Sequence, residues 1–192
     1  MSMRIILASG SPRRRELLEM FYGKNLEIIP ARGAEQAHPE LAPDALVKEL
    51  ARCKAVEVAA QAGPEDVVIA ADTVVVLDGK VLGKPRDAHD AAAMLRGLSG
   101  RSHSVFTGLC VLHGAQLLSH AEESRVQFRP LGEDEIARYI ATGEPMDKAG
   151  AYGAQGIASV FVERLEGDFF NVMGLPLCAL GKLLKQLGVD LI

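Results

Sequence analysis

VVIAADTVVVL, residues 67–77, indicates the architecture of this 192-residue chain more strongly than any other stretch. Its run of β-branched residues is typical of a buried central strand. Asp78 and Gly79 follow as a hairpin turn signal, so we expect residues 80–83 (KVLG) to form a short second strand. A sheet is therefore expected at the centre of the molecule.

Strands and helices alternate on both sides of this central strand. From Pro43, apolar positions recur at three- and four-residue steps and predict a long helix that stops at Gly63. The other expected elements are helices from Pro12 (capped by Ser11), from Asp87 to about residue 98, over 132–142 and from Pro176, and strands 4–8, 26–30, 101–113, 117–131 and 157–165, with one more short strand after a turn at Gly167 and Asp168. This order predicts an α/β or α+β protein with parallel and antiparallel strand pairs.

Length and charge limit the class of protein. A chain of this length suits one domain, since domains commonly hold about 100–200 residues, and we expect residues 1–192 to form a single domain. Asp and Glu outnumber Lys and Arg by 25 to 21, and 5% of the residues are aromatic. Both figures argue against a nucleic-acid polymer as partner, because such a partner calls for a basic face or stacking rings.

Cysteine usage and hydropathy indicate the compartment. Cys53, Cys110 and Cys178 form neither an even-numbered disulfide framework nor a CxxC pair. The apolar run at the start is too short for a secretory signal, and no later stretch is long enough to span a membrane. We therefore expect a cytoplasmic protein with no membrane partner.

The segment SGSPRRR, residues 9–15, is the first candidate for chemistry. Small polar residues lead into a helix N-terminus with adjacent arginines, and free backbone N–H groups, the helix dipole and guanidinium groups all favour a phosphate there. A capped surface helix with solvated arginines explains the same pattern. The chain lacks GxxxxGK[ST], so this segment is not a standard P-loop.

Asp72 is the second candidate, because a carboxylate inside an apolar strand is costly to bury unless it is paired or metal-bound. Lys84, in a Gly-Lys-Pro turn a short way along, supplies a cation. A carboxylate and a lysine together suit a metal–phosphate site. A purely structural role for the carboxylate is the alternative.

Residues 143–156, GEPMDKAGAYGAQG, form the third candidate, a long glycine-rich loop. The amide of Gln155 both donates and accepts hydrogen bonds, so it can pair with the O4 and N3–H edge of uracil or thymine. From the pattern alone, a surface loop with a solvated glutamine is the simpler interpretation.

Taken together, these segments resemble the Maf family of nucleotide pyrophosphatases. The matching stretches span nearly the whole chain and are LASGSPRRRELL (7–18), ELARCKA (49–55), residues 70–108 from AADTVVV to VFTG, and residues 144–177 from EPMDKAGAYGAQG to VMGLPL. The resemblance implies an α/β fold of the inosine triphosphatase type, a mixed twisted sheet flanked by helices, with two lobes and a central cleft. It also implies frequent homodimers.

The resemblance further implies hydrolysis of a nucleoside triphosphate substrate to the monophosphate and pyrophosphate, with Mg²⁺ or Mn²⁺ as cofactor. Asp72 falls at the family's catalytic acid–base position, and Arg13, Thr73 and Gln155 fall at its specificity positions. The loop resembles the branch acting on dTTP and UTP. The branch acting on 7-methyl-GTP has Glu at the position of Gln155, and a carboxylate accepts from the guanine N1–H and N2 edge.

Groups that contact phosphate or metal are implied at Ser9, Arg14, Glu35, Lys54 and Lys84. Many relatives have an acidic pair near Glu35, whereas Ala34 precedes it here, which weakens a two-carboxylate metal site at that point. We expect Asp72 and Glu35 to hold the metal, with water attacking the α-phosphorus. The sequence does not separate a base from a metal ligand at Asp72.

The same phosphate-binding residues also suit a second interpretation. The chain would then be a regulatory nucleotide-binding protein linked to cell division and septum formation, with little catalysis. Metal-dependent release of pyrophosphate separates the two interpretations.

Overall fold

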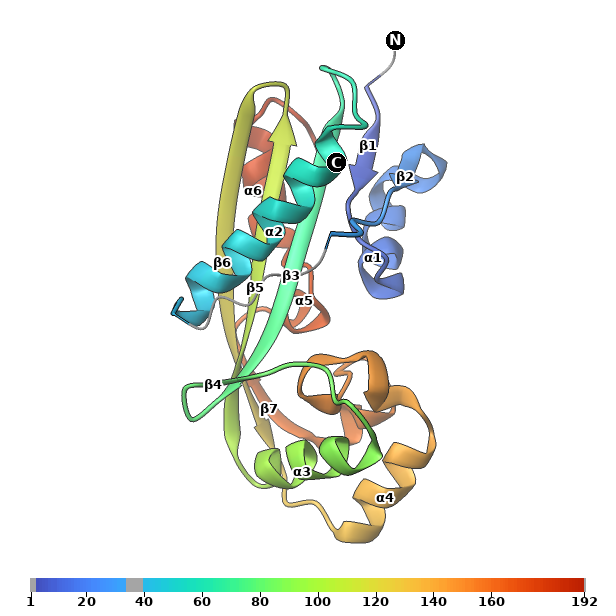
Figure 1. Ribbon diagram of the computed structural model, residues 1–192, viewed down its shortest axis with the longest axis vertical. Coiled ribbons are helices and arrows are strands. Elements are labelled where there is room, and N and C mark those ends of the chain that lie inside the picture. Colours follow the sequence, from blue (N-terminus) through green and yellow to red (C-terminus); the bar gives the residue numbers. More distant parts are fainter. Residues whose placement is uncertain (1–2, 34–39, 192) are drawn as a thin grey trace. The chain divides into compact units, whose positions relative to one another are not determined.

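The computed structural model describes residues 3–33 and 40–191, in which strands and helices alternate along the chain (Figure 1). The strands are β1 (Ile5–Leu7), β2 (Leu26–Ile28), β3 (Val67–Leu77), β4 (Lys80–Leu82), β5 (Ser102–His113), β6 (Gln116–Phe128) and β7 (Val162–Glu166). The α-helices are α1 (Pro12–Tyr22), α2 (Pro43–Ala59), α3 (Ala88–Leu98), α4 (Glu133–Ala141), α5 (Phe169–Met173) and α6 (Leu177–Gln186), and the 3-10 helices are η1 (Gly23–Asn25), η2 (Glu144–Asp147), η3 (Ala149–Ala151) and η4 (Ile157–Phe161). In this part of the chain, no helix combines the length and the apolarity that a membrane crossing needs.

The strands of the described residues join in one mixed sheet. Its order is β2-β1-β3-β5-β6-β7, and β4 pairs with β3 beside this path. Strand β1 runs parallel to both β2 and β3, whereas β3–β4 and β6–β7 are antiparallel. Asp78 and Gly79 have φ angles of 51° and 74°, as the tight turn of the β3–β4 hairpin requires. The mixed α/β sheet predicted from the sequence is confirmed.

The chain divides into two compact units. Unit 1 holds the described residues of Met1–Asp72, Thr107–Glu122 and Gly174–Ile192, and unit 2 holds Thr73–Phe106 and Glu123–Met173. Strands β3, β5 and β6 contribute residues to both units. The chain passes from unit 1 to unit 2 at the peptide bond between Asp72 and Thr73.

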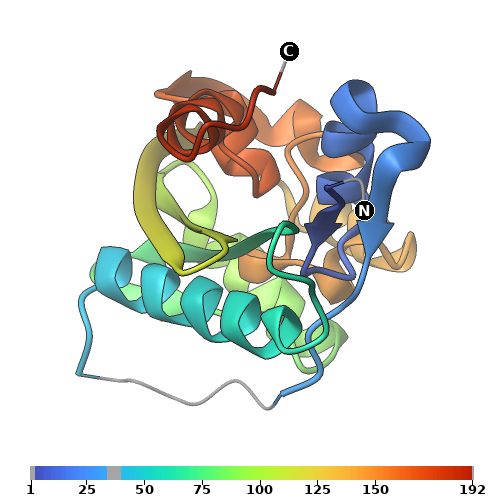
Figure 2. The ribbon, with the colours of Figure 1, turned by 90° about the horizontal axis from the view of Figure 1, so that it is seen from above.

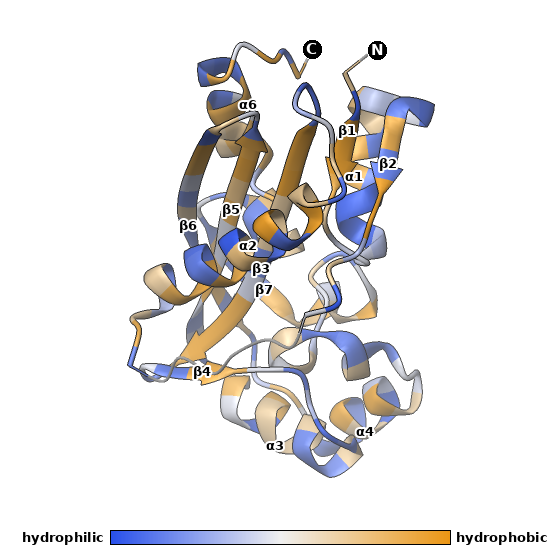
Figure 3. Ribbon diagram, turned by 45° about the horizontal axis from the view of Figure 1, so that its top comes forward, coloured by the Kyte–Doolittle hydropathy of each residue, from blue (hydrophilic) through white to orange (hydrophobic). Residues whose placement is uncertain are grey.

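In unit 1, α2 and α6 cover opposite faces of the strands (Figure 1 and Figure 2). The strands β3 and β5 are largely hydrophobic, which agrees with their burial (Figure 3). Small side chains allow α2 to approach the strands closely. The cluster under α2 consists of Ile6, Ala8, Ala51, Ala55, Val58, Val68, Ala70 and Cys110, all fully buried. The apolar face predicted from Pro43 is therefore the one that packs, although the helix ends at Ala59.

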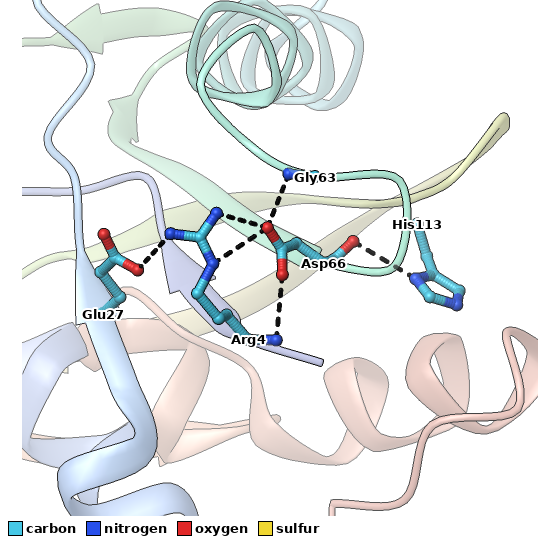
Figure 4. A network of polar contacts seen from close by, with 5 residues as sticks. All are labelled: Arg4, Glu27, Gly63, Asp66 and His113. Carbon is cyan, nitrogen blue, oxygen red and sulfur yellow. Dashed lines mark hydrogen bonds and ion pairs between the residues drawn. The ribbon is translucent and has the colours of Figure 1, made fainter. Parts of the chain in front are cut away.

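A network around Asp66 joins the first strands of unit 1 (Figure 4). The Asp66 carboxylate accepts hydrogen bonds from the Arg4 guanidinium (Nε 3.0 Å, Nη2 2.5 Å), from the Arg4 backbone N–H at 3.0 Å and from the Gly63 N–H at 2.6 Å. Arg4 Nη1 also reaches Glu27 on β2 at 2.9 Å. The bonds from Arg4 lower the pKa of the buried Asp66 carboxyl from 3.8 to about 2. The carboxylate thus ties the start of β1 to the turn before β3.

We expect Asp66→Asn to lower the free energy of unfolding at pH 7 by about 2 kcal/mol, the equivalent of this pKa shift. Because the pKa is lower in the folded state, the contribution is full above pH 3.8 and is lost as the pH falls towards 2. Urea unfolding at pH 7 and pH 3 checks this. At pH 3, the difference in the free energy of unfolding between wild type and variant should be about half of its value at pH 7. Glu27→Gln is the control, because it removes only an exposed ion pair. An equal effect of the two substitutions would contradict the assignment.

The core of unit 2 is built around three buried rings. His103, Phe128 and Tyr152 meet edge to face, with centroids 4.8–5.3 Å apart. His103 Nε2 lies 2.8 Å from the Tyr152 hydroxyl. Burial lowers the pKa of His103 to about 4, so the ring is neutral at pH 7. Helices α3 and α4 pack on this core, and Asp87 caps α3 as expected by accepting a hydrogen bond from the Asp90 N–H at 2.8 Å.

The predicted strand over residues 157–165 is wrong in its first half, where the chain forms η4 and β7 begins only at Val162. Ala158 and Phe161 are buried at a spacing of three, while Ile157 and Val160 are exposed. A spacing of three suits a 3-10 helix, whereas a strand would alternate its faces every second residue.

The short strand predicted after Gly167 and Asp168 is also wrong, because this segment forms the short helix α5. The Asp168 carboxylate accepts a hydrogen bond from the Phe170 N–H at 2.8 Å and so caps the helix start. Asn171 is fully buried and donates to the Val105 carbonyl at 3.0 Å and to Ser124 Oγ at 2.9 Å. These two contacts outweigh the strand preference of the aromatic pair at the start of α5.

Candidate active site

In unit 1, the candidate site begins at the loop after β1. Ala8 still pairs with β3, since its N–H donates to the Ile69 carbonyl at 2.8 Å. Ser9 is buried, and its hydroxyl oxygen accepts hydrogen bonds from the Ser11 N–H at 3.2 Å and from Arg14 Nη1 at 3.1 Å. Helix α1 starts at Pro12, as predicted. The expected cap is corrected in one respect: Ser11 occupies the cap position, but within the described residues its side chain makes no capping hydrogen bond.

Arg14 binds backbone carbonyl groups from distant parts of unit 1. Its Nε donates to the Gly174 carbonyl and its Nη1 to the Ala71 carbonyl, both at 2.8 Å. Ala71 directly precedes Asp72, so the guanidinium holds the peptide that carries the candidate catalytic carboxylate. Arg13 is half-buried on the same helix. The sequence predicted a phosphate contact for Arg14, and the carbonyl contacts were missed because they span 57 and 160 residues.

The carboxylate of Asp72 is buried and paired with Lys54. Lys54 Nζ on α2 donates to Asp72 Oδ1 at 2.5 Å, while Asp72 is 7% exposed. An ion pair offsets much of the cost of burying this carboxylate in an apolar strand. A carboxylate offers about four lone-pair positions, so one bond to a lysine leaves acceptor capacity for water or a cation. The structure thus brings together two residues that the sequence placed 18 positions apart.

In unit 2, the candidate residues lie on β3 and on two turns. Thr73 follows Asp72 in β3 and is half-buried, whereas Lys84 and Gln155 are exposed. Residues 83–85 are tied to η3, because the Gly150 N–H donates to the Gly83 carbonyl at 3.0 Å. Gln155 lies in a turn that is closed by a 2.9 Å hydrogen bond from the Gly156 N–H to the Gly153 carbonyl.

Of the two metal ligands expected from the sequence, Asp72 lies within the described residues. Glu35 lies outside the described residues. Within residues 3–33 and 40–191, no three His, Cys, Asp or Glu side chains gather in a way that could hold a metal ion. Asp72 nevertheless has the hard oxygen donors that Mg²⁺ prefers, and Mg²⁺ is commonly bound by one or two carboxylates together with substrate phosphates and water. The chemistry of Asp72 therefore fits a cation that arrives with a phosphate.

Sequence reasoning missed Glu144, whose carboxylate lies against the turn of Gln155. Its Oε2 accepts a hydrogen bond from the Ile157 N–H at 2.9 Å, and its Oε1 accepts one from the Tyr139 hydroxyl at 3.0 Å. The segment GEPMDK carries no local signal for these contacts, because one partner lies 13 residues further on.

The fold and these contacts define the class: an α/β protein with a buried carboxylate–lysine pair, next to a serine- and arginine-containing loop that enters a helix. The chain belongs to the Maf family, because residues 4–187 match the family model described as Maf-like protein. The predicted family membership is confirmed.

Similar proteins cover nearly the whole chain. A protein from Pyrococcus abyssi is 47% identical over 94% of this chain and 95% of its own length, and one from Caldicellulosiruptor saccharolyticus is 44% identical over 98% and 96%. Both are named dTTP/UTP pyrophosphatase. Among solved structures, the Ham1 protein of Staphylococcus aureus has a TM-score of 0.54 at 14% identity, over 95% of this chain and 98% of that one. A HAM1 protein from Coxiella burnetii has a TM-score of 0.53 at 16% identity, over 96% and 100%. These two likenesses show the fold alone.

Proposed function

We propose that this chain is a nucleoside triphosphate pyrophosphatase that hydrolyses dTTP and UTP to the monophosphate and pyrophosphate. The buried pair of Asp72 and Lys54 carries the proposal, because it combines a carboxylate with a cation. Arg14, from the segment suited to phosphate, binds the carbonyl of Ala71, the residue before Asp72. The names of the similar proteins from Pyrococcus abyssi and Caldicellulosiruptor saccharolyticus support the choice of substrates.

Both units serve this activity as one domain over residues 1–192. The family model supports this view, because it matches residues 4–187 and so includes both units. The residues proposed for substrate binding and catalysis are Ser9, Arg13, Arg14, Lys54, Asp72, Thr73, Lys84 and Gln155. The unit 1 cations and Lys84 neutralise the negative charge of the triphosphate and of the departing pyrophosphate.

Asp72 acts on the water that attacks the α-phosphorus. The water oxygen forms a bond to that phosphorus, the bond to the oxygen shared with the β-phosphate breaks, and pyrophosphate leaves with the electron pair. Asp72 accepts the proton of the attacking water, or holds the cation instead. Lys54 orients the carboxylate for either role, since it donates directly to Oδ1.

A divalent cation, Mg²⁺ or Mn²⁺, belongs to the proposal. Asp72 is the described residue that would hold it, with Glu35 as a second candidate from outside the described residues. When bound, such a cation polarises phosphate oxygens and lowers the pKa of a coordinated water. Activity should therefore disappear with a chelator and return with Mg²⁺.

Gln155 selects the base in this proposal, with Thr73 and Arg13 as further specificity residues. We expect Gln155→Glu to lower kcat/KM for dTTP and UTP by about 10–100-fold, because the amide N–H donor to the pyrimidine O4 is lost. The loss should be smaller for GTP, whose N1–H and N2 edge a carboxylate can accept. Steady-state rates with each nucleotide check this, and Gln116→Glu, an exposed glutamine at the start of β6, is the matched control. An unchanged ratio of dTTP to GTP turnover would remove Gln155 from base selection.

The proposed function is tested by pyrophosphate release from purified protein on a panel of nucleotides, including modified bases, with and without Mg²⁺. Rapid metal-dependent release from dTTP and UTP supports the enzyme. Tight nucleotide binding without turnover would support the regulatory protein linked to cell division instead. The homodimer, the cytoplasmic location and the absence of nucleic-acid polymers as partners stay predictions; sedimentation and salt-dependent oligonucleotide binding test the first and last of them.

A further inference from the structure

The turn that carries Gln155 rests directly on two side chains of unit 2. A Cβ atom added to Gly156 would lie 2.3 Å from Glu144 Oε1, and one added to Gly153 would lie 2.8 Å from Lys148 Cε. Gly156 has a φ of −114°, a value open to any residue. A side chain at position 156 would therefore displace the Glu144 carboxylate, although the backbone conformation there suits any residue.

The Glu144 carboxylate links this turn to α4. Oε2 accepts from the Ile157 N–H, directly after the turn, at 2.9 Å, and Oε1 accepts from the Tyr139 hydroxyl at 3.0 Å. Tyr139 is 2% exposed, and its ring packs edge to face on Phe161 with centroids 5.2 Å apart. Burial raises the pKa of Tyr139, so its hydroxyl stays protonated and keeps donating. The turn is thus anchored to a rigid part of the core.

Lys148 completes the support from the other end of the turn. Its ammonium group donates to the Glu144 carbonyl at 2.7 Å and to Asp147 Oδ1 at 2.6 Å. These bonds hold the aliphatic stem of Lys148 against Gly153. Tyr139, Glu144 and Lys148 together form what we call the turn platform.

We propose that Glu144 is a positioning residue for base selection. As part of the turn platform, it fixes the turn that carries Gln155, so that the Gln155 amide is held in one place. This inference rests on the proposed function, because it assigns a residue behind the one that selects the pyrimidine. Hydrogen-bond selectivity depends on placement to within about 0.5 Å, so an exposed amide on an unsupported turn would discriminate poorly.

Two substitutions at one position test the proposal. Glu144→Ala removes both hydrogen bonds and the support under Gly156, and we expect kcat/KM for dTTP and UTP to fall about tenfold, mainly through KM. The preference for dTTP over GTP should fall by a similar factor. Glu144→Gln keeps the shape, and its amide can accept from the Ile157 N–H and donate to the Tyr139 oxygen. This variant should keep the wild-type preference within about threefold.

A double-mutant cycle makes the contact itself measurable. Gly156→Ala should lower the dTTP preference in the wild type, because the new methyl group collides with Glu144. In the Glu144→Ala background the collision partner is absent, so the same change should have little further effect. Additive effects of the two substitutions would overturn the proposed contact.

The outcomes separate this inference from the proposed function. A wild-type protein without dTTP hydrolysis would reject the proposed function. A wild-type protein with dTTP preference, together with a Glu144→Ala variant of unchanged preference, would reject the inference alone. If Glu144 had a merely structural role, Glu144→Ala would lower the folded fraction and reduce the turnover of all nucleotides equally. The ratio of dTTP to GTP turnover would then stay unchanged, and unfolding curves would show the loss of folded protein.

Discussion

Asp72→Asn should lower the rate of pyrophosphate release by about 10³-fold or more. The amide can neither accept the proton of the attacking water nor neutralise a cation, and general-base and metal contributions are each of about this size or larger. The isosteric amide keeps the volume of the buried side chain, so the fold should persist with a loss of about 1–3 kcal/mol for the broken pair with Lys54. Single-turnover rates with dTTP and Mg²⁺, together with urea unfolding, measure both effects.

Asp66→Asn is the matched control for this substitution. Both carboxylates are buried in unit 1 and paired with a cation, but Asp66 lies directly before β3, in the network with Arg4. The Asp66→Asn variant should be less stable than the wild type but release pyrophosphate at the wild-type rate. Near-normal turnover by Asp72→Asn would reject the assigned role.

The two open roles of Asp72 are separable by metal titration. If Asp72 is a metal ligand, Asp72→Glu should raise the Mg²⁺ concentration needed for the half-maximal rate, and high Mg²⁺ should restore part of the activity. If Asp72 is a general base, the same substitution should lower the rate at all Mg²⁺ concentrations. The titration thus answers a question that the sequence leaves open.

Gly108→Ala should destabilise the protein by about 3–5 kcal/mol, because α2 packs against the bare backbone of β5 at this point. A Cβ atom at Gly108 would lie 2.1 Å from the Val47 carbonyl oxygen and 2.2 Å from its carbon. Neither atom can rotate away as the end of a long side chain can, so helix and strand must separate. Because α2 also carries Lys54, the separation should weaken the pair with Asp72.

Gly97→Ala is the control for this glycine. It lies within α3, where a Cβ atom would meet Leu77 Cδ2 at an ordinary 3.5 Å. Alanine is the better helix former, so this variant should gain about 0.5–1 kcal/mol. Thermal and urea unfolding of the two variants measure this difference in stability. If Gly108→Ala is obtained only as an unfolded chain, its circular dichroism spectrum shows this directly. Equal stability of the two variants would contradict the packing of α2 on β5.

The sequence alone was sufficient for the local features. Runs of β-branched residues, three-to-four-residue apolar spacing and helix-start residues are local signals, so the central strand, the apolar face of α2 and the helix start at Pro12 were all predicted correctly. The segments at η4 and α5 were misassigned because contacts with residues distant in the sequence, not local preference, set their conformation.

For the candidate site, residue types and motifs pointed to Asp72 as a carboxylate that needs a partner. The resemblance to the Maf family added Lys54 as a phosphate or metal contact, but nothing in the spacing joined Lys54 to Asp72. That pairing exists because α2 packs on the strands of unit 1 and directs one turn of its surface at β3. The carbonyl ligands of Arg14 and the contact of Gly108 with Val47 arise in the same way. Periodicity is a property of neighbours along the chain, whereas such contacts depend on strand order and on how closely two elements pack, and these are set only when the chain has folded.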